Sequence, residues 1–316
     1  MSVTSALYTG VSGLLANSEG INVIGSNLAN VNTVGFKGSR VGFSDLLSVT
    51  VGNTVGSNNQ IGRGVQIQKI DNTFSQGSFE TTENASDLAI QGESFFVLGA
   101  VDSPAGIPIT GMAASYTRAG SFRINPDPTI ISDKYLTNPD GLRVLDEDGN
   151  PIVFQTNDPP VNTDFVRISS IDPQGRITFL RFDNTAAYYD RTTPGGTQVQ
   201  AEAKKIGTLN IPGKNYLEKS GGSIYKPTSA TTGVPLAAAP RMYSATYSST
   251  VDPVTGAVTG GTATTERIFS SSLEQSNVDM AAQFVKMILT QRAYSANSKT
   301  ITTADQMTQE LLNLKQ

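Results

Sequence analysis

The 316 residues include no cysteine, no histidine and no tryptophan. Without cysteine the chain cannot form a disulfide, a zinc knuckle, an iron–sulfur cluster or a thiol nucleophile. Without histidine it cannot hold a Ser–His–Asp triad or an imidazole-ligated metal. Carboxylate, lysine or tyrosine chemistry stays open, as does no chemistry at all. We therefore expect no cofactor and no metal site.

Charge is also scarce, because charged residues make up 16% of the chain against a usual ~25%. The net charge of −4 and the lack of a basic run argue against nucleic acid or an anionic membrane as a partner. No segment approaches the ~18 to 20 apolar residues that span a bilayer. The N-terminus lacks a basic region and its apolar residues are interrupted, so it is a poor secretory signal.

The N-terminal segment has the apolar periodicity of a helix. Its apolar row, spaced mainly by seven, comprises Leu7, Val11, Leu14, Ile21 and Leu28. Glu19 is the only charged residue from Met1 to Asn30, so the other faces carry Ser, Thr, Asn and Gly. These faces lack the charges that a solvated helix normally presents.

The C-terminal segment has a longer apolar row with helical spacings of three and four. Its large members include Val285, Ile288, Leu289, Met307, Leu311 and Leu314; we call the two rows together the seam. Ser276 or Asn277 is suited to cap this helix, with Asp279 in its first turn. A helix of about 38 residues would be about 57 Å long. Two helices of such length predict pairing as a coiled coil.

The N-terminal helix is expected to be marginal by itself. Burying the heptad-spaced side chains contributes ~6 to 12 kcal/mol, whereas fixing the backbone costs ~1 to 2 kcal/mol per residue. Gly10, Gly13, Gly20 and Gly25 each cost about 1 kcal/mol relative to alanine. Two interpretations stay open: an intramolecular hairpin with the C-terminal helix, or in addition uncharged faces that order by packing on neighbouring subunits.

Between about residues 60 and 268 the pattern changes to short runs with period two or β-branched residues, separated by turn residues. Strands are expected at 65–69, 88–90, 95–98, on both sides of a turn at 118–120, and at 142–145, 152–154, 166–168, 177–182 and 206–209. Residues 228–265 are expected to be a loop-like insertion, and 146–205 are a candidate small subdomain. The predicted fold class is α+β, with long terminal helices and a central all-β domain between them.

The segment Asp146–Glu147–Asp148–Gly149–Asn150 offers oxygen ligands that would suit calcium. It lacks the later bidentate acid of an EF-hand loop, and a hairpin turn between two strands explains it better. No carboxylate pair stands in a context that indicates a glycan hydrolase. A β-rich surface adhesin would leave the terminal helices unexplained. We therefore do not expect an enzyme.

Several longer stretches are more specific. They are NLANVNTVGFKGSR, FSQGSFETTENASDLAIQGESFFVL, YTRAGSFRIN, YLTNPDGLRVL and SLEQSNVDMAAQFVKMILTQRAYSANSKTI, in this order. Together they resemble the axial proteins of the bacterial flagellum, the rod and hook subunits. GFKGSRVGFSDLL and GTLNIPGKNYLEKSGGSIYKPTSATTG are most similar to the hook subunit, with the distal rod subunit as the alternative.

The resemblance implies a non-enzymatic subunit that polymerises helically into a hollow tube. Residues 1–70 and 271–316 would form an inner tube through the seam, and residues 71–270 a β-rich outer domain. The joint between helix and outer domain would comprise Asn27, Asn30, Asn32, Gly35 and Phe36. A hook subunit would form a flexible tube that couples rod to filament and transmits torque, whereas a distal rod subunit would form a stiff drive shaft.

The resemblance also implies partners and a location. The partners are copies of the chain itself, the rod, hook-cap and hook–filament junction proteins, and the type III export apparatus. Subunits would pass through that apparatus unfolded, without a cleaved signal peptide. The implied location is the extracellular hook or the basal body, with no membrane insertion and no nucleic acid.

Because the ends are expected to order on assembly, limited proteolysis of dilute monomer should remove both termini. The surviving core should run from about residue 70 to about residue 270, as judged by mass spectrometry of the fragments. Protease-resistant termini in dilute monomer would contradict the assembly-ordering argument.

Overall fold

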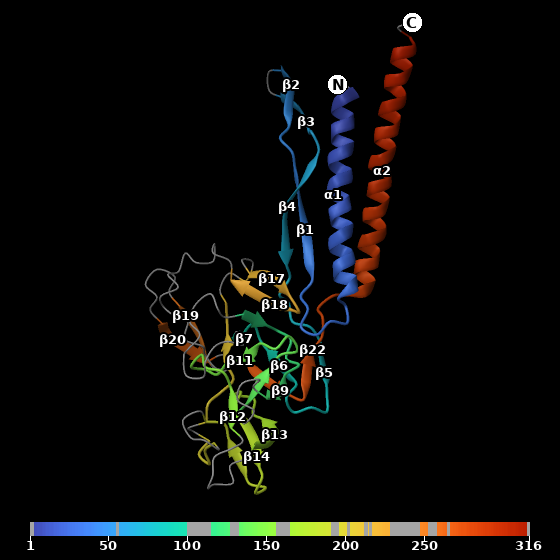
Figure 1. Cartoon of the computed structure of the whole chain (residues 1–316). Coiled ribbons are helices and arrows are strands. Elements are labelled where there is room, and N and C mark those ends of the chain that lie inside the picture. The colour runs from blue at the N-terminus through green and yellow to red at the C-terminus, as the bar shows by residue number, and fades with distance from the viewer. Residues whose placement is uncertain are drawn as a thin grey trace. The chain divides into compact units, whose positions relative to one another are not determined.

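The computed structural model describes residues 3–54, 57–99, 115–126, 133–155, 165–190, 196–200, 203–211, 214, 217–227, 247–251, 258–263 and 266–314. The chain divides into two compact units (Figure 1). The first contains residues 1–31, 37–73 and 278–316, and the second contains residues 32–36 and 74–277. Each unit is therefore assembled from separate pieces of the chain. The predicted succession of helix, β-rich region and helix is confirmed.

The first unit contains both helices, α1 (Val3–Ala29) and α2 (Met280–Asn313), which lie side by side and antiparallel (Figure 1). Asp279 caps α2, because its carboxylate accepts hydrogen bonds from Ala281 N (2.9 Å) and Ala282 N (3.2 Å). The expected caps were therefore wrong. Asn277 instead donates its side-chain amide to Ser75 O (3.1 Å), and α2 is shorter than expected.

Small residues on α1 allow the two helices to approach closely. A Cβ atom on Gly10 would lie 2.7 Å from Ile301 Cγ1, and one on Gly13 would lie 2.5 Å from Asn297 Nδ2. The buried positions of α1 are Gly10, Gly13, Ala16, Gly20, Ile24 and Asn27. The contact is thus made by small residues more than by the heptad-spaced leucines. Within the helix pair, these glycines supply space that larger residues would fill.

A long β-ribbon completes the first unit. Its strands are β1 (Ser39–Asp45), β2 (Val49–Thr54), β3 (Ser57–Ile61) and β4 (Val65–Asn72), with β1 paired to β4 and β2 to β3, both antiparallel. The ribbon contacts α1, where Ser12 Oγ accepts a hydrogen bond from Val65 N (3.3 Å). Sequence periodicity predicted only β4 of these four strands.

The second unit is built on a nine-stranded sheet with the order β12-β10-β11-β7-β8-β18-β17, to which β16 adds on β7 and β9 on β10. Smaller sheets pair β13-β14-β15, β6 with β21, β5 with β22, and β19 with β20. The strands are β5 (Phe79–Thr81), β6 (Leu88–Gln91), β7 (Phe95–Gly99), β8 (Ser115–Thr117), β9 (Arg123–Pro126), β10 (Asp133–Thr137), β11 (Arg143–Val144), β12 (Val153–Gln155), β13 (Phe165–Ile171), β14 (Ile177–Arg181), β15 (Ala186–Tyr188), β16 (Thr208–Leu209), β17 (Leu217–Gly221), β18 (Ile224–Pro227), β19 (Tyr247–Val251), β20 (Val258–Ala263), β21 (Arg267–Ser270) and β22 (Ser272–Glu274).

The core of the second unit surrounds β7, whose five residues are all buried. One face packs into a large cluster that continues through Phe154 and Phe165, which stack at 4.5 Å, into the β13-β14-β15 sheet. The other face packs around Phe95 and Tyr225, whose rings meet edge to face. The core therefore runs without interruption into the segment that the sequence marked as a candidate subdomain.

Two polar segments of the second unit were expected to be turn and loop. The segment from Asp146 to Asn150 is a turn, as predicted, because Asp146 N donates a hydrogen bond to Asn150 O (2.8 Å) and Gly149 has a φ of +86°. No group of three or more acidic side chains in the described parts of the chain could hold a metal ion. The second, residues 228–265, includes the hairpin β19–β20, so it is not a loop throughout; its other residues lie outside the described ranges.

Candidate assembly surface and helix joint

Asn27 fastens the end of α1 to the chain that follows. Its side chain is 2% exposed. Its Oδ1 accepts a hydrogen bond from Ser39 N (2.8 Å), and its Nδ2 donates to Ser39 O (2.7 Å). The amide thus pairs with both backbone groups of Ser39, as a neighbouring strand would. Asn30 closes the last helical turn by donating its Nδ2 to Ser26 O (2.9 Å), whereas Asn32 is exposed.

Gly35 lies where no other residue would fit. Its φ of +66° is in the left-handed region, and a Cβ atom would lie 2.4 Å from Ala119 N. Its N–H donates to the main-chain oxygen of Glu274 (2.7 Å). One residue earlier, the Ser223 hydroxyl donates to Val34 O (3.0 Å). Backbone groups of this short segment are therefore bonded to residues that come much later in the sequence, in the turn between β17 and β18 and in β22.

Phe36 is buried beside these contacts, with 8% of its surface exposed. The Lys219 ammonium lies 4.6 Å from the centre of the Phe36 ring, which is cation–π geometry. Burial lowers the pKa of Lys219 below its usual value. Asn277 N donates to Phe36 O (3.4 Å). The chain is thus held at Val34, Gly35 and Phe36 in succession.

A buried ion pair lies under this segment. Arg118 and Glu274 have side chains that are 2% and 0% exposed, with Arg118 Nη1 3.3 Å from Glu274 Oε2. Arg118 Nη2 also donates to Gly92 O (2.6 Å), and Glu274 Oε1 accepts from Gly77 N (2.9 Å). Burial lowers the pKa of the Arg118 guanidinium, and the Glu274 carboxylate opposes that shift. The pair therefore joins residues 77, 92 and 118 to residue 274, which lies more than 150 positions further along the sequence.

Sequence reasoning did not single out Arg118 or Glu274. Both lie inside stretches that carried the resemblance, YTRAGSFRIN and SLEQSNVDM. The available signal was a charge among small, apolar and uncharged polar residues, since a charge in such a context is either solvated or paired. Their partnership spans 156 positions, so no local pattern reveals it.

The helix pair leaves many large apolar side chains exposed. The α1 members of the seam are half-buried, except Val11, which is exposed. The α2 members are all exposed, from 51% at Ile288 to 83% at Leu314. The structure therefore does not gather the seam into one intramolecular core. Large exposed apolar patches mark sites of interaction, although no described helix is long and apolar enough to cross a membrane.

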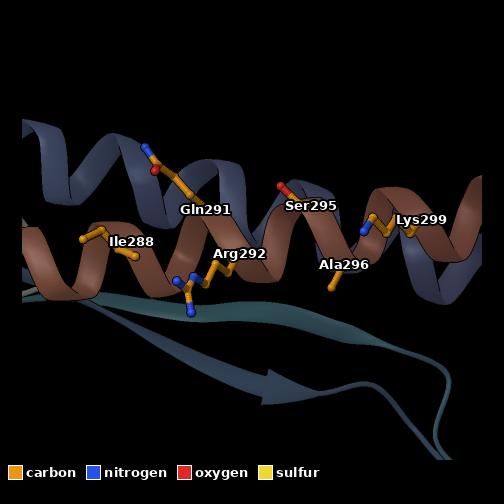
Figure 2. A pocket seen from close by; sticks show the side chains of 6 residues that line it. All are labelled: Ile288, Gln291, Arg292, Ser295, Ala296 and Lys299. Carbon is orange, nitrogen blue, oxygen red and sulfur yellow. The ribbon is translucent and has the colours of Figure 1, made fainter.

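One part of α2 carries an open groove of about 500 Å³ (Figure 2). Its lining comprises Ile288, Gln291, Arg292, Ser295, Ala296 and Lys299. All six residues are exposed, and the two charged ones are both cations. The groove has apolar and cationic walls and no carboxylate, so it cannot perform acid–base chemistry with paired carboxylates.

Paired terminal helices with exposed apolar rows, joined to a β-rich unit, define a class of protein that is built to pack against other chains. Residues 7–37 match the family described as Flagella basal body rod protein, and residues 270–314 match Flagellar basal body rod FlgEFG protein C-terminal. Over 318 residues the chain is 32% identical to the Flagellar basal-body rod protein FlgG of Bacillus subtilis (strain 168), with 98% of each chain covered. The chain belongs to the flagellar rod and hook family, and it is a structural protein, not an enzyme.

Two further relatives refine the comparison. The Flagellar basal-body rod protein FlgG of Buchnera aphidicola subsp. Schizaphis graminum is 30% identical over 318 residues, covering 98% of this chain and 99% of its own. The Flagellar hook protein FlgE of Borreliella burgdorferi is 38% identical over 148 residues, covering 44% of this chain and 30% of its own. Similarity to rod proteins thus extends from end to end, and similarity to this hook protein does not.

Replacing Arg118 by Met should lower the free energy of unfolding of the second unit by about 3–5 kcal/mol, because the Glu274 carboxylate would stay buried without its cation. The double variant Arg118→Met, Glu274→Gln should recover part of that loss, since no uncompensated charge remains. Urea denaturation followed by circular dichroism measures both changes.

The matched control is Arg40→Met, which removes an arginine that is 73% exposed and 3.6 Å from Asp71. Arg40→Met should lower the free energy of unfolding by less than about 1 kcal/mol, as is usual when an exposed ion pair is removed. Equal effects of Arg118→Met and Arg40→Met would show that the buried pair does not stabilise the fold.

Proposed function

We propose that this chain is a subunit of the flagellar basal-body rod, and of its distal part, which polymerises helically into a stiff hollow tube that transmits torque. The observation that carries the proposal is the similarity over 98% of the chain to several proteins named FlgG. The expectation of a hook subunit has weaker support, because the hook relative covers 44% of the chain. In this proposal the chain is located in the basal body and is exported without a cleaved signal peptide.

The exposed seam gives the proposal its physical basis. In a tube, neighbouring copies would cover Val285, Leu289 and Leu311, which a lone subunit leaves 58%, 61% and 58% exposed. Burying such a side chain contributes about 1.5–3 kcal/mol. Each copy offers several of them, so assembly would supply the stabilisation that an isolated helix pair lacks.

The hook stays the second candidate, favoured by the 38% identity to FlgE over 148 residues. The two functions make different mechanical demands. A hook must bend, so the outer contacts between its subunits must slide. A rod must resist bending, so those contacts must hold.

Electron microscopy of polymer formed from the purified full-length chain separates the two. We expect straight tubes that stay straight under changes of pH, salt and temperature. Tubes that curve or supercoil reversibly would support the hook and contradict the rod.

Leu289→Asp should prevent polymerisation, because a carboxylate buried in the packed seam costs several kcal/mol. The same change at Phe182, which is 71% exposed in the second unit, serves as the matched control and should allow tubes to form. Sedimentation quantifies polymer, and circular dichroism checks that both variants fold. Normal tubes from Leu289→Asp would show that the seam is misassigned.

A further inference from the structure

We propose that Glu19 of one copy binds in the basic groove on α2 of a neighbouring copy, with its carboxylate on Arg292. The proposal rests on the proposed function, because it takes the occupant of the groove to be a second copy in the same tube. It assigns a specific charged contact, and with it a register, to a surface on which most of the other side chains are uncharged.

Glu19 is the acidic half of the contact. It is the only charged residue of α1, and it is exposed. Its carboxylate accepts one hydrogen bond, from Asn22 Nδ2 (3.1 Å), and makes no ion pair within the described part of the chain. Tyr8 and Leu15 stand on the same outward side of α1, 75% and 68% exposed. Glu19 is thus an exposed carboxylate without an ion-pair partner among the described residues, and it lies beside exposed apolar side chains.

Arg292 and Lys299 are the basic half. They are seven residues apart, which places both on one side of α2, and both line the groove. In Figure 2 the Arg292 side chain extends from α2 on the same side as Ala296. Among the described residues neither cation has an acidic partner. The groove therefore presents positive charge beside the apolar wall of Ile288.

The two surfaces match in spacing as well as in charge. Copies in a helical tube are related by rotation about its axis and translation along it. In a tube whose axis runs along the helix pair, α1 of one copy therefore runs antiparallel to α2 of the next, as within one copy. Placing Glu19 against Arg292 in antiparallel helices then places Leu15, one turn away, against Ala296. A large apolar side chain thus meets a small one, and the acid meets the base.

The same two residues do not pair within one copy. Gly20 of α1 lies against Thr290 of α2, so Glu19 and Arg292 stand at similar heights along the helix pair. Both side chains are nevertheless exposed and unbonded to each other. Each side chain is therefore exposed on the helix pair of one copy and is available to bind another chain.

Charge reversal in mixed subunits tests the contact. Glu19→Arg alone and Arg292→Glu alone should each raise the critical concentration for polymerisation roughly tenfold or more, because like charges then face each other. An equimolar mixture of the two variants should polymerise at close to the wild-type concentration, since opposite charges meet wherever the variants alternate. The double variant Glu19→Arg, Arg292→Glu should also polymerise at close to the wild-type concentration, and it should do so by itself. Sedimentation of full-length chains gives all four values.

Glu218→Arg is the matched control for Glu19→Arg, because Glu218 is exposed on β17 and the substitution changes the net charge by the same amount. It should leave the critical concentration unchanged. If the double variant polymerises normally and the mixture does not, the pair forms within one copy, and the proposal is wrong. The proposal is also wrong if neither single charge reversal changes the critical concentration. Tube shape is scored separately in the same samples. Curved tubes with intact rescue would contradict the rod function and retain the contact.

Discussion

The carboxylate of Glu274 is the interaction on which the second unit depends. Its two oxygens accept from Gly77 N and Arg118, and its main-chain oxygen accepts from Gly35 N. A fully buried carboxylate is destabilising unless its oxygens are bonded, so these four segments must come together. Residues near both ends of the sequence are among them. The second unit therefore cannot reach its final form until almost the whole chain is available to fold.

The helix pair distributes its residues in the opposite way to an ordinary globular core. Gly10, Gly13 and Ala16 are buried between α1 and the rest of the first unit, while Leu15 and Leu289 are exposed. Glycine between helices gives little apolar burial, so the pair gains little stability from its internal contact. The side chains with the most to gain from burial face outward. Such an arrangement favours a helix pair that is completed by other chains, as the proposed tube requires.

Features set by local pattern were predictable from the sequence, and features set by distant contacts were not. Both helices, the buried strand β7 and the turn at Gly149 follow from periodicity and turn chemistry. Strand β17 (Leu217–Gly221) was missed because four of its five residues are exposed, so it lacks an apolar pattern. The glycines of α1 were counted as a cost because their partner helix is not visible in a single sequence. The ion pair of Arg118 with Glu274 was not predicted for the same reason, because a single sequence does not show which distant residues are in contact.

The segment from Val34 to Phe36 is a fixed part of the second unit. A flexible linker is a solvated chain whose backbone makes no lasting bonds, as in Gly- and Ser-rich segments. Here Val34, Gly35 and Phe36 are each bonded through the backbone, to Ser223, Glu274 and Asn277. Gly35 moreover occupies a backbone conformation that a close neighbour enforces. Three bonded residues in succession leave this segment few conformations, so it folds as part of the second unit and not as a solvated linker.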